Sequence, residues 1–224
     1  MSRQAVARVA SRLQEISSDF VIVGGCAVML LLPETVEPEL RATEDVDCVV
    51  PIHSYGQYHR LEEQLRRLGC LPDPEGPLCR WLVDEIVTDL MPVSEEVLGF
   101  GNRWYDEALK EPVVVQFSES LSVKVVNLSV FLATKFEAHR SRGGQYEESH
   151  DFEDIVLALA YSVDACPLVR SASPNVRDFL AGEMHVFLQS RRPEDVVSRC
   201  LPSTRQSLVK EVLGRMREIS ELAQ

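Results

Sequence analysis

Apolar and polar positions repeat along the chain with two different periods. Over residues 3–17 and again over 54–68, apolar side chains recur every three to four positions, which predicts two amphipathic helices. Residues 20–23 and 45–50 are short runs rich in valine, which are typical of buried strands. The segment 27–32 follows the first of these strands and is apolar on all sides, so we expect a helix packed under the sheet.

The pattern changes near residue 127. Before that point, residues 78–91 alternate as a strand does, and predict either one bent strand or a tight hairpin that turns near Asp84 and Glu85. Residues 113–117 and 121–126 are predicted to be the two arms of another hairpin. Beyond residue 127 only helices are predicted, over 130–139, 150–161, 174–189, 194–199 and 204–222.

This change predicts two domains, an α/β (α+β) domain over residues 1–127 and a helical domain over 128–224. The chain of 224 residues is 45% hydrophobic, which excludes a disordered chain. Its formal net charge of −12 disfavours broad, sequence-independent binding to nucleic acid, because such binding depends on Lys and Arg contacts to phosphate. A local basic patch is compatible with this charge.

The sequence favours a cytoplasmic protein without membrane association. Charged residues interrupt the N-terminal segment, so it lacks the apolar core of a signal peptide. The longest apolar run, residues 20–32, is too short to cross a bilayer and contains two glycines. The six cysteines are scattered without a Cys-x-x-Cys pair, which is typical of reduced thiols in the cytoplasm.

Candidate chemistry concentrates around the first two strands. Asp45 and Asp47 are spaced so that both side chains lie on one face of a strand, where two carboxylates repel each other and favour a divalent cation between them. Gly24 and Gly25 end the preceding strand and would let a phosphate approach the backbone N–H groups of the next helix. Asp89 would join the pair if its strand lies beside theirs. Together these features predict chemistry on a nucleoside triphosphate.

Each feature also has a simpler interpretation. An aspartate pair at a strand edge is often a solvated turn, and two glycines often form only a turn. A lysine in mid-helix such as Lys135 is usually solvated, and Asp151 and Asp154 would suit the dipole of a helix N-terminus. Trp104 and Tyr105 would stack on a base or fill the core. The apolar strand that follows the aspartate pair favours the metal interpretation.

Six segments together resemble a known family. They are 23–27, 41–47, 88–92, 98–105, 131–138 and 149–155. In this order and spacing they resemble the nucleotidyltransferase superfamily of DNA polymerase β type. Within it, the chain is most similar to an uncharacterised subgroup of the bacterial AbiEii/AbiGii toxin-like nucleotidyltransferases. The resemblance implies a mixed sheet with helices, followed by a helical domain that closes over the nucleotide.

The resemblance also implies a role for each site residue. By it, Asp45 and Asp47 hold two Mg²⁺ ions, or Mn²⁺, while Asp89 binds one of them and helps to activate an acceptor hydroxyl. Lys135 contacts the triphosphate of the NTP substrate. The implied nucleotide-binding set is Gly24, Gly25, Arg41, Asn102, Arg103 and Lys135. The implied accessory residues, which orient Lys135 or the acceptor, are Arg142, His150, Asp151 and Asp154.

The implied reaction transfers a nucleoside monophosphate from NTP to an acceptor hydroxyl and releases pyrophosphate. The acceptor stays open among tRNA or other RNA, a small molecule and a protein. RNA would require a basic groove, formed for example by Arg103, Arg140 and Arg142, and the toxin-like relatives suggest an antitoxin partner. The net charge suits a cationic small molecule better. A non-catalytic nucleotide-binding module is the third hypothesis.

Three positions depart from the family pattern. Cys26 stands where many relatives carry Ser or Thr to bind phosphate, and a thiol donates only weakly. Gly101 stands where relatives often have Ser, and Gln145 lies near the place of an acidic residue. These departures bear on nucleotide affinity and acceptor choice more than on the metal site.

Overall fold

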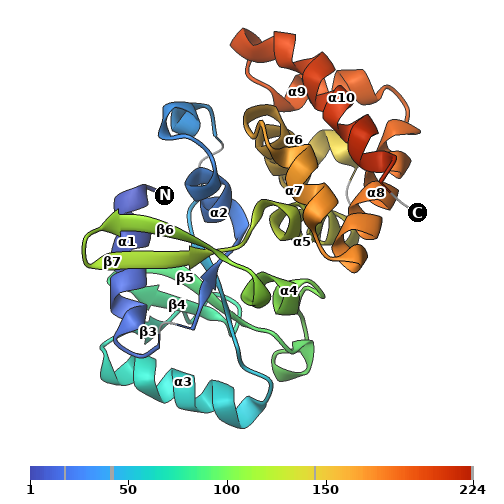
Figure 1. Cartoon of the computed structure of the whole chain (residues 1–224). Coiled ribbons are helices and arrows are strands. Elements are labelled where there is room, and N and C mark those ends of the chain that lie inside the picture. Colours follow the sequence, from blue (N-terminus) through green and yellow to red (C-terminus); the bar gives the residue numbers. More distant parts are fainter. Residues whose placement is uncertain (18, 41–42, 144, 223–224) are drawn as a thin grey trace. The chain divides into compact units, whose positions relative to one another are not determined.

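The computed structural model describes residues 1–17, 19–40, 43–143 and 145–222 (Figure 1). The chain forms two compact units, each built from two stretches of sequence. The first unit comprises Met1–Leu31 and Ala42–Asn127, and the second comprises Leu32–Arg41 and Leu128–Gln224. Within the described residues, no helix combines the length and the apolar character that a membrane crossing requires.

The first unit contains a mixed sheet. In the described part of the chain, seven strands lie in the order β3-β4-β5-β2-β1-β7-β6. Their bounds are β1 Val21–Ile22, β2 Val46–Val50, β3 Leu71–Pro72, β4 Arg80–Val83, β5 Ile86–Pro92, β6 Val113–Ser118 and β7 Leu121–Val125. The pairs β2/β5 and β1/β7 are parallel, and the other pairs are antiparallel. The predicted mixed sheet with helices is confirmed, whereas the short strand β3 was not predicted.

Helices of the first unit follow the predicted apolar stripes. They are α1 Arg3–Gln14, α2 Gly24–Leu31, α3 Tyr55–Arg67 and α4 Tyr105–Lys110, with a short 3-10 helix at Glu95–Val97. Ser54 and Gln57 form a capping box that starts α3, and Gly69 ends it with a φ of +81°. α2 begins at the glycine pair, three residues before the predicted start. α4 was not predicted.

β4 and β5 form the tight hairpin that was one of the two predicted alternatives. Asp84 and Glu85 make the turn with φ angles of +48° and +68°, which few residues other than glycine adopt. Arg8 stabilises this turn by donating to the Asp84 carbonyl oxygen at 2.9 Å. The turn sets the register of the hairpin, so that Arg80 on β4 is paired with Asp89 on β5.

The second unit is helical in its described residues, and helices were predicted for its stretch beyond residue 127. Its α-helices are α5 Leu128–Ser141, α6 His150–Tyr161, α7 Ala165–Ser171, α8 Pro174–Leu188, α9 Pro193–Cys200 and α10 Val209–Ser220. Its 3-10 helices are Glu34–Glu39, Tyr146–Glu148 and Ser203–Leu208. α7 was not predicted, and α10 begins five residues later than predicted because Arg205 has non-helical backbone angles, with φ −119° and ψ 17°.

Two features hold the second unit together. Its core contains the fully buried rings of Phe131, Phe136, Phe152 and Phe187. The segment that precedes β2 is attached through Glu39, whose carboxylate accepts hydrogen bonds from the guanidinium of Arg205 at 2.6 Å and from the hydroxyl of Tyr161. Chain stretches far apart in sequence are therefore joined by a charged contact as well as by apolar packing.

Candidate functional site: a carboxylate cluster on the central strands

Three carboxylates come together on the two central parallel strands of the first unit. Asp47 on β2 is paired directly with Asp89 on β5, and Asp45 lies one residue before β2 begins. One oxygen from each side chain lies within 4.8 Å of the others. Asp89 is buried, while Asp45 and Asp47 are half-buried. The structure thus brings all three predicted metal ligands together.

Contacts from Thr43 and Cys26 hold Asp45 in place. The Thr43 hydroxyl lies 3.1 Å from Asp45 Oδ1, to which it donates a hydrogen bond. The Cys26 thiol donates to the backbone carbonyl oxygen of Asp45 at 3.2 Å. Cys26 therefore supports the carboxylate cluster from the first turn of α2. The sequence analysis did not single out Thr43.

The glycine pair lies against the same cluster. Gly24 has a φ of +63°, and a Cβ atom there would lie 1.8 Å from Asp47 Oδ2, so only glycine fits beside this carboxylate. A Cβ atom on Gly25 would lie 3.1 Å from the Thr43 hydroxyl oxygen. Both glycines begin α2, whose first N–H groups have no partners within the helix. Backbone donors and carboxylates are thus neighbours, as binding of a metal and a phosphate together requires.

Arg80 is a member of the site that the sequence analysis missed. Its guanidinium donates through Nε and Nη2 to the two carboxylate oxygens of Asp89, both at 2.8 Å. Nη2 also donates to Asp45 Oδ2 at 3.1 Å. The hydrogen bond to Asp89 raises the pKa of Arg80 above its ordinary value, so the guanidinium is charged throughout the physiological pH range.

A signal for Arg80 was present in the sequence. A two-residue turn at Asp84 and Glu85 pairs Val83 with Ile86, and counting back three further pairs places Arg80 opposite Asp89. The Cβ atoms of directly opposite residues on neighbouring strands are roughly 4.5–5.5 Å apart, so an arginine at this position reaches the carboxylate. The hairpin interpretation alone would therefore have found this contact.

The residues of the cluster fit a divalent cation. Carboxylate oxygens are the ligands that Mg²⁺ and Mn²⁺ prefer, and Mg²⁺ usually takes one or two of them together with substrate phosphates. Three carboxylates against one guanidinium leave a formal charge of −2 on the cluster. Because Gly24 has no Cβ atom, the Asp47 carboxylate can lie directly beside the start of α2. Asp45, Asp47 and Asp89 are therefore the residues that could hold a metal.

The loop before α4 holds two predicted nucleotide-binding residues. Asn102 accepts a hydrogen bond from the backbone N–H of Trp104 at 3.1 Å, which shapes the turn. The guanidinium carbon of Arg103 lies 4.8 Å from the ring centroid of Trp104. The Trp104 ring is buried, which favours the core-filling interpretation over base stacking. Tyr105 donates to the sulfur of Met91 at 2.9 Å. Arg41, the other predicted nucleotide-binding arginine, lies outside the described residues.

Lys135 is buried in the second unit between two carboxylates. Its ammonium nitrogen lies 2.7 Å from Asp154 Oδ2 and 3.2 Å from Asp151 Oδ1, and Arg142 donates to the other oxygen of Asp151. Lys135 is 8% exposed, so it is not a solvated surface lysine. Burial acts to lower the pKa of Lys135, but the charges of Asp154 and Asp151 outweigh it and keep the pKa above its ordinary value.

Two more predicted residues of the second unit, Arg140 and His150, lie beside carboxylates. Arg140 donates to Glu183 at 2.9 Å. His150, a predicted accessory residue, is exposed at the start of α6, and its Nδ1 lies 3.4 Å from a Glu153 oxygen. The ion pairs of Arg140 with Glu183 and of Arg142 with Asp151 reduce the positive charge that the predicted RNA groove would require.

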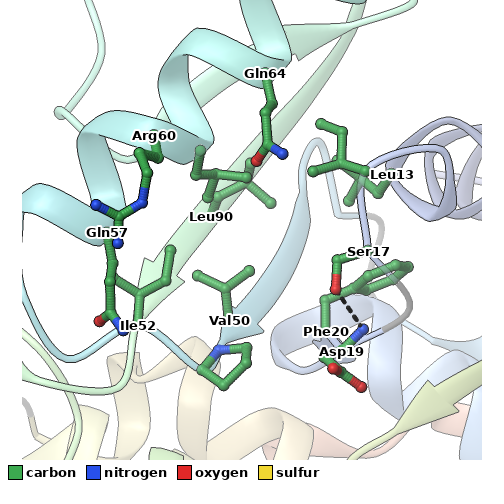
Figure 2. Close-up of a pocket in the computed structure, with 13 residues that line it drawn as sticks. Leu13, Ser17, Asp19, Phe20, Val50, Ile52, Gln57, Arg60, Gln64 and Leu90 are labelled. Atoms are coloured by element: carbon green, nitrogen blue, oxygen red, sulfur yellow. Dashed lines mark hydrogen bonds between the residues drawn. The ribbon is translucent and has the colours of Figure 1, made fainter.

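A separate cavity of about 230 Å³ lies on the other face of the sheet (Figure 2). Val50 and Leu90 line it. Val50 is three positions from Asp47 on β2, and Leu90 is one position from Asp89 on β5. Because side chains alternate along a strand, both point to the face opposite the cluster. Arg60 and Gln57 of α3 lie on one side of the cavity, across from Asp19 in Figure 2. No residue of the predicted site lines it.

Comparisons with known proteins give matches among solved structures. No family model matches the chain, and no curated protein does. An antigenic nucleotidyltransferase-like protein from Paracoccidioides brasiliensis matches with a TM-score of 0.50 and 18% identity, over 94% of this chain and 91% of that one. This chain shares its fold. The α/β class with a mixed sheet and a following helical part is thereby confirmed.

Two further matches have lower TM-scores. The antibiotic-resistance factor ANT(2'')-Ia in solution gives 0.46 with 15% identity, over 83% of this chain and 92% of that chain. The same factor in complex with adenylyl-2''-tobramycin gives 0.44 with 14% identity, over 83% of this chain and 99% of that chain. With TM-scores under 0.5, neither match carries an argument about this chain. Activity must be argued from the site.

Proposed function

We propose that this protein is a divalent-metal-dependent nucleotidyltransferase, which moves a nucleoside monophosphate from NTP to an acceptor hydroxyl and releases pyrophosphate. The observation that carries the proposal is the cluster of Asp45, Asp47 and Asp89 beside a helix that begins with Gly24 and Gly25. The fold supports it, because the structural match with a TM-score of 0.50 is a nucleotidyltransferase-like protein.

The residues of the first unit would divide the work. Asp45, Asp47 and Asp89 would hold Mg²⁺ or Mn²⁺, which when bound supplies positive charge to the α-phosphate and the leaving pyrophosphate. Gly24 and Gly25 would bind phosphate oxygens through backbone N–H groups. Asp89 would accept the proton of the acceptor hydroxyl. The acceptor oxygen then bonds to the α-phosphorus, the bond to the bridging oxygen breaks, and pyrophosphate leaves with that electron pair.

Residues outside the cluster would have roles of their own. Lys135 would bind the triphosphate, with Asp151 and Asp154 fixing the direction of its ammonium group. Their 3.2 Å and 2.7 Å contacts support a fixed direction. Arg142, which donates to Asp151, would be an accessory residue. His150, which lies on α6 together with Asp151, would be another. Arg41, Asn102 and Arg103 would contribute to nucleotide binding.

For the acceptor, we infer a small cationic molecule bearing a hydroxyl. RNA recognition would require a run of unopposed positive charge. The formal charge of the chain is −12, and Arg140 and Arg142 are each paired with a carboxylate. A negative surface attracts a cationic acceptor instead. If RNA proved to be the acceptor instead, the protein would act as the toxin-like family that the sequence resembles is thought to act. An antitoxin partner would then be expected.

The test is transfer of label from each α-³²P-labelled NTP, with Mn²⁺ or Mg²⁺, to separated small-molecule, RNA and protein fractions of a cell lysate. The double variant Asp45→Ala/Asp47→Ala is expected to lose transfer. The matched control is Asp178→Ala/Asp195→Ala, which removes two carboxylates that are 50% and 62% exposed, and it should retain transfer. Label in RNA would reject the small acceptor. Nucleotide binding without transfer to any fraction would support the non-catalytic module instead.

A further inference from the structure

We propose that Arg80 is an internal counter-cation of the carboxylate cluster. It lets the chain fold without a metal, and a metal ion must replace its contact with Asp45 in order to bind. The inference rests on the proposed function only in taking Asp45, Asp47 and Asp89 as metal ligands. Arg80 is thus a positioning residue that also limits how tightly the empty cluster takes up a cation.

The contacts of Arg80 with the two aspartates differ in kind. The guanidinium holds both oxygens of Asp89 in a fork with two bonds of 2.8 Å. It reaches Asp45 through one bond of 3.1 Å. A two-pronged contact is stronger and more directional than a single one. A cation at the cluster can therefore displace the single bond to Asp45 while the fork on Asp89 stays in place, because each Asp89 oxygen keeps a further lone pair for the cation.

The β3–β4 turn fixes the position of Arg80. The Arg80 N–H donates to the Pro77 carbonyl oxygen at 2.8 Å, and the Arg80 carbonyl oxygen accepts from Asp73 N–H at 3.1 Å. Gly76 lies against the side chain, since a Cβ atom there would be 2.6 Å from Arg80 Cδ. The Arg80 side chain is 28% exposed. Its place in the cluster is therefore set by the fold.

Electrostatics gives the direction of each effect. Without Arg80, three carboxylates with oxygens within 4.8 Å would share a partly buried site, which opposes folding when no metal is present. The same loss of positive charge makes the cluster more attractive to a divalent cation. Removal of Arg80 should therefore weaken the metal-free fold and tighten metal binding at once. A residue with only a packing role would not produce both effects.

The experiment measures thermal unfolding and Mn²⁺ binding by calorimetry, without nucleotide, for the wild type and Arg80→Met. In EDTA, the Tm of the variant is expected to fall by on the order of 5 °C. Mn²⁺ should bind the variant about tenfold more tightly than the wild type and raise its Tm further. The control Arg67→Met, which removes an arginine that is 76% exposed, should change neither quantity.

Two results would overturn the proposal: an unchanged Tm of Arg80→Met in EDTA, or Mn²⁺ binding that is weaker in the variant than in the wild type. If Arg80→Met does not fold, the double variant Arg80→Met/Asp45→Asn decides. If Arg80 stabilises the fold by compensating the charge of the cluster, removal of one carboxylate should restore folding. Failure to restore it would contradict the proposal.

The outcome is separable from that of the proposed function. Absence of nucleotidyl transfer with Mn²⁺ binding intact would count against the proposed reaction alone. Absence of Mn²⁺ binding in both the wild type and Arg80→Met would reject the metal site, and with it the replacement step of this inference.

Discussion

Asp47 on β2 and Asp89 on β5 are directly paired across two parallel strands. Residues 47 and 89 are brought together because both strands lie in the centre of the sheet, where neighbours on each side restrict register shifts. Like charges placed opposite each other destabilise a sheet unless another group compensates them. Here Arg80 does so from the next strand, β4, and a bound cation would do so more strongly.

Asp47→Asn tests the metal site without changing side-chain volume. The variant should lose Mn²⁺ affinity by at least roughly tenfold. Loss of a residue that only orients a metal ligand already costs about that much, and Asp47 is proposed to be a ligand itself. Calorimetric titration with Mn²⁺ in the absence of nucleotide measures this directly. Asp195→Asn, an exposed carboxylate on α9, is the control and should bind as the wild type does. Equal Mn²⁺ affinity in Asp47→Asn and wild type would show that this cluster is not the binding site.

Gly24→Ala should cost stability and metal binding together. The new Cβ atom would lie 1.8 Å from Asp47 Oδ2, and the φ of +63° is unfavourable for alanine. The expected loss of unfolding free energy is about 1–3 kcal/mol, measured by denaturant titration. Mn²⁺ affinity should also fall, because Asp47 must move.

Gly56→Ala is the matched control for this substitution. Gly56 lies in helix α3, and a Cβ atom there meets nothing within 4 Å. Alanine should therefore leave the unfolding free energy unchanged or increase it by up to about 0.5 kcal/mol, since it has the higher helix propensity and Gly56 lies in the first turn. If both variants lost the same stability, the contact with Asp47 would not explain the effect at Gly24.

The pH dependence of stability should show the contact at Glu39. Hydrogen bonds from Arg205 and then from Tyr161 lower the pKa of Glu39 from 4.5 to about 2. A carboxyl group with a lowered pKa in the folded state stabilises the protein above its unfolded pKa, and this contribution is lost as the pH falls from about 4.5 towards 2. The unfolding curves of the wild type and Glu39→Gln should differ at pH 7 and converge as the pH approaches about 2.

The control for the pH series is Glu119→Gln, an exposed carboxyl group in the turn between β6 and β7. Its stability should follow that of the wild type at every pH. A constant difference between wild type and Glu39→Gln across the series would mean that packing, and not the charge of Glu39, holds this segment to the rest of the second unit.

Local pattern sufficed for most of the fold and for the carboxylates. The spacing of Asp45 and Asp47 and the alternation around Asp89 were enough to predict a shared face, because side-chain direction in a strand follows from residue number. The elements missed were short, such as β3 and α7. Two residues in a strand or seven in a helix give too few positions for a period to show.

Contacts that depend on tertiary packing were not predictable in the same way. Lys135 and its partner Asp151 lie on different helices, α5 and α6, so no local period relates them, and only the family resemblance suggested a link between them. Cys26 replaces the expected phosphate donor, but its contact with the carbonyl oxygen of Asp45 depends on how α2 packs against β2. Arg80 is the exception, since the hairpin turn alone sets its register with Asp89.

Lys135→Met separates the structural role of this lysine from its proposed contact with triphosphate. Two buried carboxylates would lose their shared ammonium partner, so the unfolding free energy should fall by about 3 kcal/mol or more. The double variant Lys135→Met/Asp154→Asn removes one charge of each sign and should recover most of this loss.

Nucleotide affinity of that double variant then reports on the proposed role alone. If Lys135 binds the triphosphate, the Kd for a non-hydrolysable NTP analogue should rise by about tenfold or more even though the fold is retained, because a charged hydrogen bond to phosphate is worth roughly 1.5–3 kcal/mol. Lys210→Met removes an exposed lysine from α10 and should leave the Kd unchanged. An unchanged Kd in the double variant as well would assign Lys135 to the core of the second unit, where it neutralises Asp151 and Asp154.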